Sequence, residues 1–142
     1  MPKNRAQVAE LIVCVLVISS CSRQKTISPE ELHSHIQEAI SLASESELFI
    51  DSVRERRTTY HFAVEHAGYL DRMAGRNLKE LEQAKSAPEM QSRLQQLRTE
   101  LNDLEQNLSD LRNGIGNDQA LAQSARRIAS VKNRLEQGNP RP

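Results

Sequence analysis

Apolar residues recur along most of this chain at steps of three and four, which places them on one face of an α-helix. Short polar or glycine-containing segments divide this pattern into four stretches. The stretches predict helices over about residues 29–55, 59–86, 88–113 and 118–136. We therefore expect an all-α protein in which each helix turns one apolar face toward a shared core.

The first predicted helix has a clear start and a less clear end. Residues 28–31 (Ser-Pro-Glu-Glu) combine an N-cap serine, a proline at the first helical position and a glutamate three residues after the cap. We place the end within residues 54–59 (Arg-Glu-Arg-Arg-Thr-Thr), because basic residues suit a helix C-terminus and either threonine can cap the next helix. The apolar faces on either side of this break include Leu48 and Tyr60.

The third apolar pattern is the most regular in the chain. Its members follow one another at steps of four and three: Met90, Leu94, Leu97, Leu101, Leu104, Leu108 and Leu111. Nearly every residue between them is polar or charged, so they form a 3.5-residue leucine seam of the coiled-coil kind. Residues 86–89 (Ser-Ala-Pro-Glu) precede it with the spacing of a capping box. Residues 113–118 (Asn-Gly-Ile-Gly-Asn-Asp) come after it, and their glycines suit a left-handed turn before a cap at Asn117 or Asp118.

The connections between the predicted helices are short, so neighbouring helices should be antiparallel. We predict an antiparallel up-down four-helix bundle, made of two helical hairpins, over residues 28–137, with a polar tail over residues 138–142. An elongated helical rod, in which the leucine seam pairs with a second chain, is the alternative. Gly68 and Gly75 lie on one face of the second helix and leave a flat strip, which either a helix of the same bundle or a partner can approach.

The beginning of the chain has a different character. Lys3 and Arg5 precede eight consecutive apolar residues, at positions 11–18, and small residues then lead to Cys21. A membrane-spanning helix needs about 20 apolar residues, so this run is too short to be one. Ile18-Ser19-Ser20-Cys21 resembles the lipobox of bacterial lipoprotein precursors, and it comes after the positive start and short apolar core of a signal peptide.

This resemblance implies that residues 1–20 are a lipoprotein signal peptide, that Cys21 is acylated, and that residues 21–27 tether the body to a membrane. In that family, a residue other than Asp after the cysteine is typical of the outer membrane in cells with two membranes, and here it is Ser22. We therefore expect an extracytoplasmic, lipid-anchored protein of the cell envelope. An ordinary signal peptide and a buried N-terminal helix are the alternatives. The other cysteine, Cys14, would leave with the signal peptide, so no thiol would remain for a disulfide.

The composition of the chain argues against two classes of function, nucleic-acid binding and catalysis. The chain has 19 basic and 19 acidic residues, and without Lys3, Arg5 and Glu10 of the signal peptide 17 and 18 remain. This near-neutral body lacks the basic field that nucleic-acid binding needs, so we expect no nucleic-acid partner. The sequence contains no phosphate-binding loop and no nucleophile elbow, and we expect no enzyme and no cofactor.

The remaining candidates for a functional site are the histidines of the first predicted hairpin, which could bind a metal ion. Glu-x-x-His, which di-iron four-helix proteins use on two helices, occurs once, at Glu30 and His33. His61 and Glu65 are four residues apart and share a helix face. The weak candidates for a transition-metal site are His33, His35, His61, Glu65 and His66.

The function that these patterns favour is a structural, scaffolding or protein-interaction module, held at the membrane through lipidated Cys21. Its partner would be another envelope protein or a second copy of the chain. The alternative is a periplasmic sensor or binder of metal ions or stress signals that uses the histidine-bearing hairpin.

Overall fold

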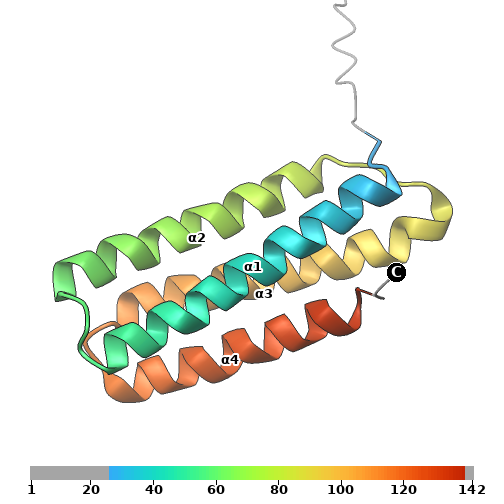
Figure 1. Ribbon diagram of the computed structural model, residues 1–142. Helices are drawn as coiled ribbons and strands as arrows, with labels where there is room; N and C mark the ends of the chain where they lie inside the picture. Colours follow the sequence, from blue (N-terminus) through green and yellow to red (C-terminus); the bar gives the residue numbers. More distant parts are fainter. Residues whose placement is uncertain (1–25, 140–142) are drawn as a thin grey trace, which may run out of the picture.

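Four helices pack side by side in the computed structural model, which describes residues 26–139 (Figure 1). The helices are α1 (Pro29–Arg54), α2 (Tyr60–Glu82), α3 (Gln91–Gly114) and α4 (Asp118–Gln137), and a 3-10 turn, η1 (Pro88–Met90), precedes α3. Successive helices run in opposite directions, so the predicted antiparallel four-helix bundle is confirmed. Cys21 and the predicted signal peptide lie outside the described residues.

The leucine seam lies at the centre of the core. Its six leucines are at most 2 % exposed: Leu94, Leu97, Leu101, Leu104, Leu108 and Leu111. They belong to one cluster with apolar side chains of the other three helices, among them Ile50, Leu70 and Ile128. The chain's own helices therefore cover the seam, and the alternative of a rod that pairs with a second chain is wrong.

Three predicted helix caps are confirmed. The Ser28 hydroxyl accepts a hydrogen bond from the backbone N–H of Glu31 at 3.1 Å, and the Glu31 carboxylate accepts one from the N–H of Ser28 at 2.9 Å. The side chains of Thr59 and Asn117 each accept a hydrogen bond from the backbone three residues further on. These bonds satisfy N–H groups that have no partner within the first turn of a helix.

The connection from α1 to α2 falls within the predicted segment. Arg56 has a φ of 56°, in the left-handed region. The N–H of Arg56 donates to the carbonyl of Val53 at 3.0 Å, and the N–H of Arg57 donates to the carbonyl of Ser52 at 2.9 Å. This pair of hydrogen bonds is a Schellman motif, which usually has glycine at the left-handed position. The helix thus ends without the glycine that would have marked its end in the sequence.

The connection from α2 to α3 differs from the prediction. The second helix ends at Glu82 rather than near residue 86. Ser86 does not cap the next helical segment: Ala87 is the N-cap of η1, and the buried hydroxyl of Ser86 has no hydrogen-bond partner among the described residues. The predicted capping box at residues 86–89 is therefore wrong.

Arg98 of α3 takes the place of a local cap at the end of α2. Its guanidinium donates to the carbonyl of Leu81 at 3.0 and 2.6 Å and to the carbonyl of Ala84 at 2.7 Å. Carbonyls in the last turn of a helix have no partner within the helix, so a side chain from a neighbouring helix allows α2 to stop early. Arg93 does the same at the end of α4, where it donates to the carbonyl of Gly138.

The glycines act through their small size rather than through left-handed geometry. Within residues 26–139 no glycine has a positive φ, so the predicted left-handed turn between α3 and α4 is wrong. A Cβ atom on Gly114 would lie 2.8 Å from the Cβ of Ala120, so the missing side chain lets the start of α4 approach the end of α3. Gly68 and Gly75 face Arg112 and Glu105 of α3, so a helix of the same bundle occupies the predicted flat strip.

The four helices do not pack equally closely against one another. α1 packs mainly on α4 and α2 mainly on α3, whereas α1 and α2 touch each other much less. α1 also touches α3 across the centre of the bundle. The side of the bundle between α1 and α2 is therefore the open one.

Candidate functional site

The structure does not gather the predicted metal candidates into one site. His33, His61 and Glu65 are exposed. His35 Nδ1 lies 3.6 Å from a carboxylate oxygen of Glu38, and His66 Nε2 lies 3.4 Å from one of Glu45. In the described part of the chain, no group of three or more histidine, cysteine, aspartate or glutamate side chains is placed to hold a metal ion.

Instead, His66 lies at the centre of an aromatic cluster, which comprises Phe49, Phe62, His66 and Tyr69. The rings of Phe62 and His66 stack at 5.4 Å between centroids, and those of His66 and Tyr69 stack at 5.8 Å. Phe49 of α1 meets His66 edge-on at 4.8 Å. Such contacts add roughly 0.5–1.5 kcal/mol beyond the burial of the rings. The cluster therefore fixes the relative position of α1 and α2 where they are otherwise weakly packed.

Several large apolar side chains face solvent, and two of them, Phe62 and Tyr69, belong to the aromatic cluster. Among the described residues these exposed side chains are Leu48 (72 % exposed), Tyr60 (69 %), Phe62 (52 %) and Tyr69 (46 %). Leu48 and Tyr60 were expected in the core, and this expectation is wrong because both side chains are mostly exposed. The core consists mainly of Leu, Ile and Ala, together with Phe49 and Val131, and all four Phe and Tyr residues of the chain lie between positions 49 and 69. Exposed aromatic side chains that gather in one place mark interaction surfaces.

A groove of about 350 Å³ runs along the open side of the bundle, beside Tyr69. We call it the α1–α2 groove, and its lining is Ser34, Gln37, Glu38, Ser41, Leu42, Glu45, Tyr69, Met73 and Asn77. Leu42 is buried and forms the apolar floor. Phe62 and His66 continue the wall formed by Tyr69 and Met73, since the four residues recur on α2 at steps of four, three and four.

The two walls of the groove differ in chemistry. The wall from α1 has serines, an amide and two half-exposed glutamates, Glu38 and Glu45, which are the charged members of the lining. The wall from α2 has a tyrosine, a methionine and an amide. The acidic and the apolar wall thus face each other along the groove. Sequence reasoning missed this arrangement, although the steps from Phe62 to Met73 already mark a second apolar stripe on α2.

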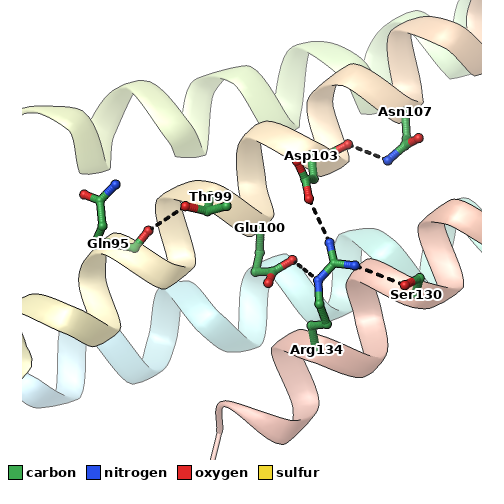
Figure 2. A network of polar contacts seen from close by, with 7 residues as sticks. All are labelled: Gln95, Thr99, Glu100, Asp103, Asn107, Ser130 and Arg134. Carbon is green, nitrogen blue, oxygen red and sulfur yellow. Dashed lines mark hydrogen bonds and ion pairs between the residues drawn. The ribbon is translucent and has the colours of Figure 1, made fainter.

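The most connected charged cluster lies elsewhere, between α3 and α4 (Figure 2). Arg134 donates to Glu100 at 2.7 Å, to Asp103 at 2.8 Å and to the hydroxyl of Ser130 at 3.0 Å. The Glu100 side chain is only 7 % exposed. The cavity beside Arg134 and Glu100 has about 10 Å³, which is about the room that one water molecule needs. This cluster therefore joins two helices and leaves no space for a ligand.

Comparison with known proteins finds no relative. No protein-family model matches the chain, and neither does any curated protein or solved structure. None of the helices formed by residues 26–139 has the length and apolar character to cross a membrane. The α1–α2 groove and its exposed aromatic rim are the features that bear on function.

Proposed function

We propose that this protein is a scaffolding or protein-interaction module of the cell envelope, held at a membrane by acyl chains on Cys21. Residues 1–20 act as the signal peptide, and the helical body lies outside the cytoplasm. In a cell with two membranes the helical body is anchored to the outer membrane and faces the periplasm. The protein acts by binding rather than by catalysis.

One observation carries this proposal: two exposed aromatic side chains, Phe62 and Tyr69, lie on the wall that α2 contributes to the groove. Phe62 and Tyr69 are about half exposed although their rings are held in place by His66. A monomeric protein gains little from aromatic rings in water, whereas rigid exposed rings supply much of the binding energy in protein interfaces. A protein partner that covers the α1–α2 groove would bury them.

The path of the chain places the proposed tether near one end of the α1–α2 groove. The tether reaches the bundle at Ile27, whose side chain is buried and whose N–H donates to the carbonyl of Lys85 at 2.8 Å. The start of α1 and the end of α4 lie at one end of the bundle, and the connection from α1 to α2 lies at the other (Figure 1). The groove begins at Ser34, seven residues after Ile27, and Phe62 extends its aromatic wall toward the opposite end of the bundle.

Site-specific photocrosslinking in living cells tests this function. A photoreactive amino acid replaces Tyr69 in the groove, and a control protein has it in place of Arg126, which is exposed on α4. We expect crosslinks from position 69 to a defined envelope protein, and the loss of these crosslinks when Cys21→Ser prevents acylation. Crosslinks that are the same from both positions, or that link only copies of this chain, would contradict the proposal.

A further inference from the structure

We infer that the α1–α2 groove binds a basic, amphipathic helical segment of the partner protein. This inference rests on the proposed function and specifies its partner. It follows from the two walls of the groove, because one wall is acidic and the other is apolar.

The acidic wall calls for positive charge. Glu38 and Glu45 lie seven residues apart on α1, which is two helical turns or about 10 Å. Their side chains are 55 % and 50 % exposed, and the cationic neighbours near them, His35 and His66, carry charge only when protonated. Two carboxylates at this spacing fit two Lys or Arg side chains that are also two turns apart on a bound helix.

The apolar wall calls for an apolar face on the same segment. Tyr69 and Met73 stand opposite the glutamates, and Phe62 extends this wall by two turns. The lining on α1 extends from Ser34 to Glu45, about 16 Å along the helix axis, which matches about three turns of helix. A helix with one basic and one apolar face can satisfy both walls at once, as in other grooves that bind helices.

Charge excludes two other occupants. In a second copy docked groove to groove, Glu38 and Glu45 would face either the same glutamates, which repel them, or the partner's apolar wall, which gives them no cation, so both arrangements oppose association. An anionic lipid surface would meet the same glutamates and be repelled. A basic segment is the occupant for which both walls are favourable.

A selection from random peptides tests the inference. Twelve-residue peptides displayed on phage are selected against the full acylated chain in lipid nanodiscs. We expect the retained peptides to carry Lys or Arg and apolar residues at steps of three and four. The chain contains no tryptophan, so the fluorescence of one tryptophan added to a synthetic peptide reports its binding.

Paired variants show whether the groove is the site. Glu38→Gln with Glu45→Gln should weaken the selected peptides at least about tenfold, and added salt should weaken binding to the unchanged protein. Glu82→Gln with Glu89→Gln alters two exposed carboxylates outside the groove by the same total charge and should leave affinity unchanged. Circular dichroism verifies that both double variants remain folded.

Three results would overturn the inference: no enrichment of peptides, enrichment of peptides without basic residues, or equal affinity for both double variants. Crosslinks from position 69 to an envelope protein, together with any of these results, would leave the proposed function standing and reject only the basic helix. The absence of such crosslinks would reject the function itself.

Discussion

Arg56 holds a backbone conformation that side chains disfavour. With a φ of 56° it stands at the left-handed position of the Schellman motif that ends α1. A residue with a Cβ atom loses roughly 1–2 kcal/mol there, and glycine does not. The strain is local, because it arises from the backbone of this one residue.

Arg56→Gly should therefore stabilise the bundle. We expect a gain of about 0.5–1 kcal/mol in the free energy of unfolding, since relief of the left-handed strain exceeds the added freedom of glycine in the unfolded chain. Urea denaturation followed by circular dichroism measures it. The matched control is Arg57→Gly, where φ is not positive and glycine brings only the entropic cost. Equal effects of the two substitutions would contradict this explanation.

Two glycines should respond to alanine in opposite ways. Gly114→Ala would place a Cβ atom 2.8 Å from that of Ala120 and should destabilise the protein by about 1–3 kcal/mol. Gly68→Ala meets only the ends of two arginine side chains, the nearest atom being that of Arg72 at 3.3 Å, and should stabilise α2 by up to about 1 kcal/mol. The difference between their melting temperatures is the measurement, and a Gly114→Ala protein as stable as the unchanged one would refute the packing argument.

At the scale of the helices, ion pairs of two basic side chains join α4 to both of its neighbours, α3 and α1. Arg134 joins it to α3 through Glu100 and Asp103, and Lys132 joins it to α1 through Glu47. The hydrogen bond with Glu47 raises the pKa of Lys132 above 10.5, burial opposes this, and the charges of Glu47 and Glu136 add to the increase. Since the pKa is raised in the folded protein, the contribution of Lys132 to stability is complete below pH 10.5 and is lost as pH rises through the folded pKa.

Glu47→Gln tests this link between α1 and α4. At about pH 8 the variant should be less stable than the unchanged protein by about 0.5–1 kcal/mol. The difference should shrink as pH rises from 10.5 through the raised folded pKa, because above that pKa the lysine is uncharged in both proteins. Asp51→Asn, an exposed change on the same helix, should show no such dependence on pH. Chemical denaturation over a series of alkaline pH values provides the data, and a difference that stays constant would reject the proposed ion pair.

The helices were largely predictable, whereas the groove was not. The leucine seam and the caps at Ser28 and Thr59 depend on local sequence, so spacing alone was sufficient to predict them. The cap of α2 by Arg98 joins residues 17 apart in sequence, and no local pattern indicates it. The groove depends on which pairs of helices pack most closely, and this is a property of the whole core. Phe62 was therefore not recognised as part of a site.

At the scale of the whole molecule, we expect folding to be independent of the proposed anchor. The core formed by the described residues extends from Ile27 to Leu135, and Cys21 precedes it by six residues. We expect Cys21→Ser to move the protein from the membrane fraction to the soluble fraction of the cell envelope and to leave its melting temperature unchanged. Metabolic labelling with an azide-bearing palmitate should mark the unchanged protein and a Cys14→Ser control, but not Cys21→Ser. Labelling of Cys21→Ser would contradict the assignment of the acylated residue.

The buried attachment at Ile27 has a consequence for how a partner is found. Only residues 22–26 separate it from the proposed anchor, and they span at most about 18 Å. With this anchor the bundle, whose longest helix measures about 39 Å, would tilt about this point and stay within a layer next to the lipid. The search for a partner would then take place in two dimensions. A protein that entered this layer would meet the groove at a local concentration set by the number of anchored molecules per unit of membrane area.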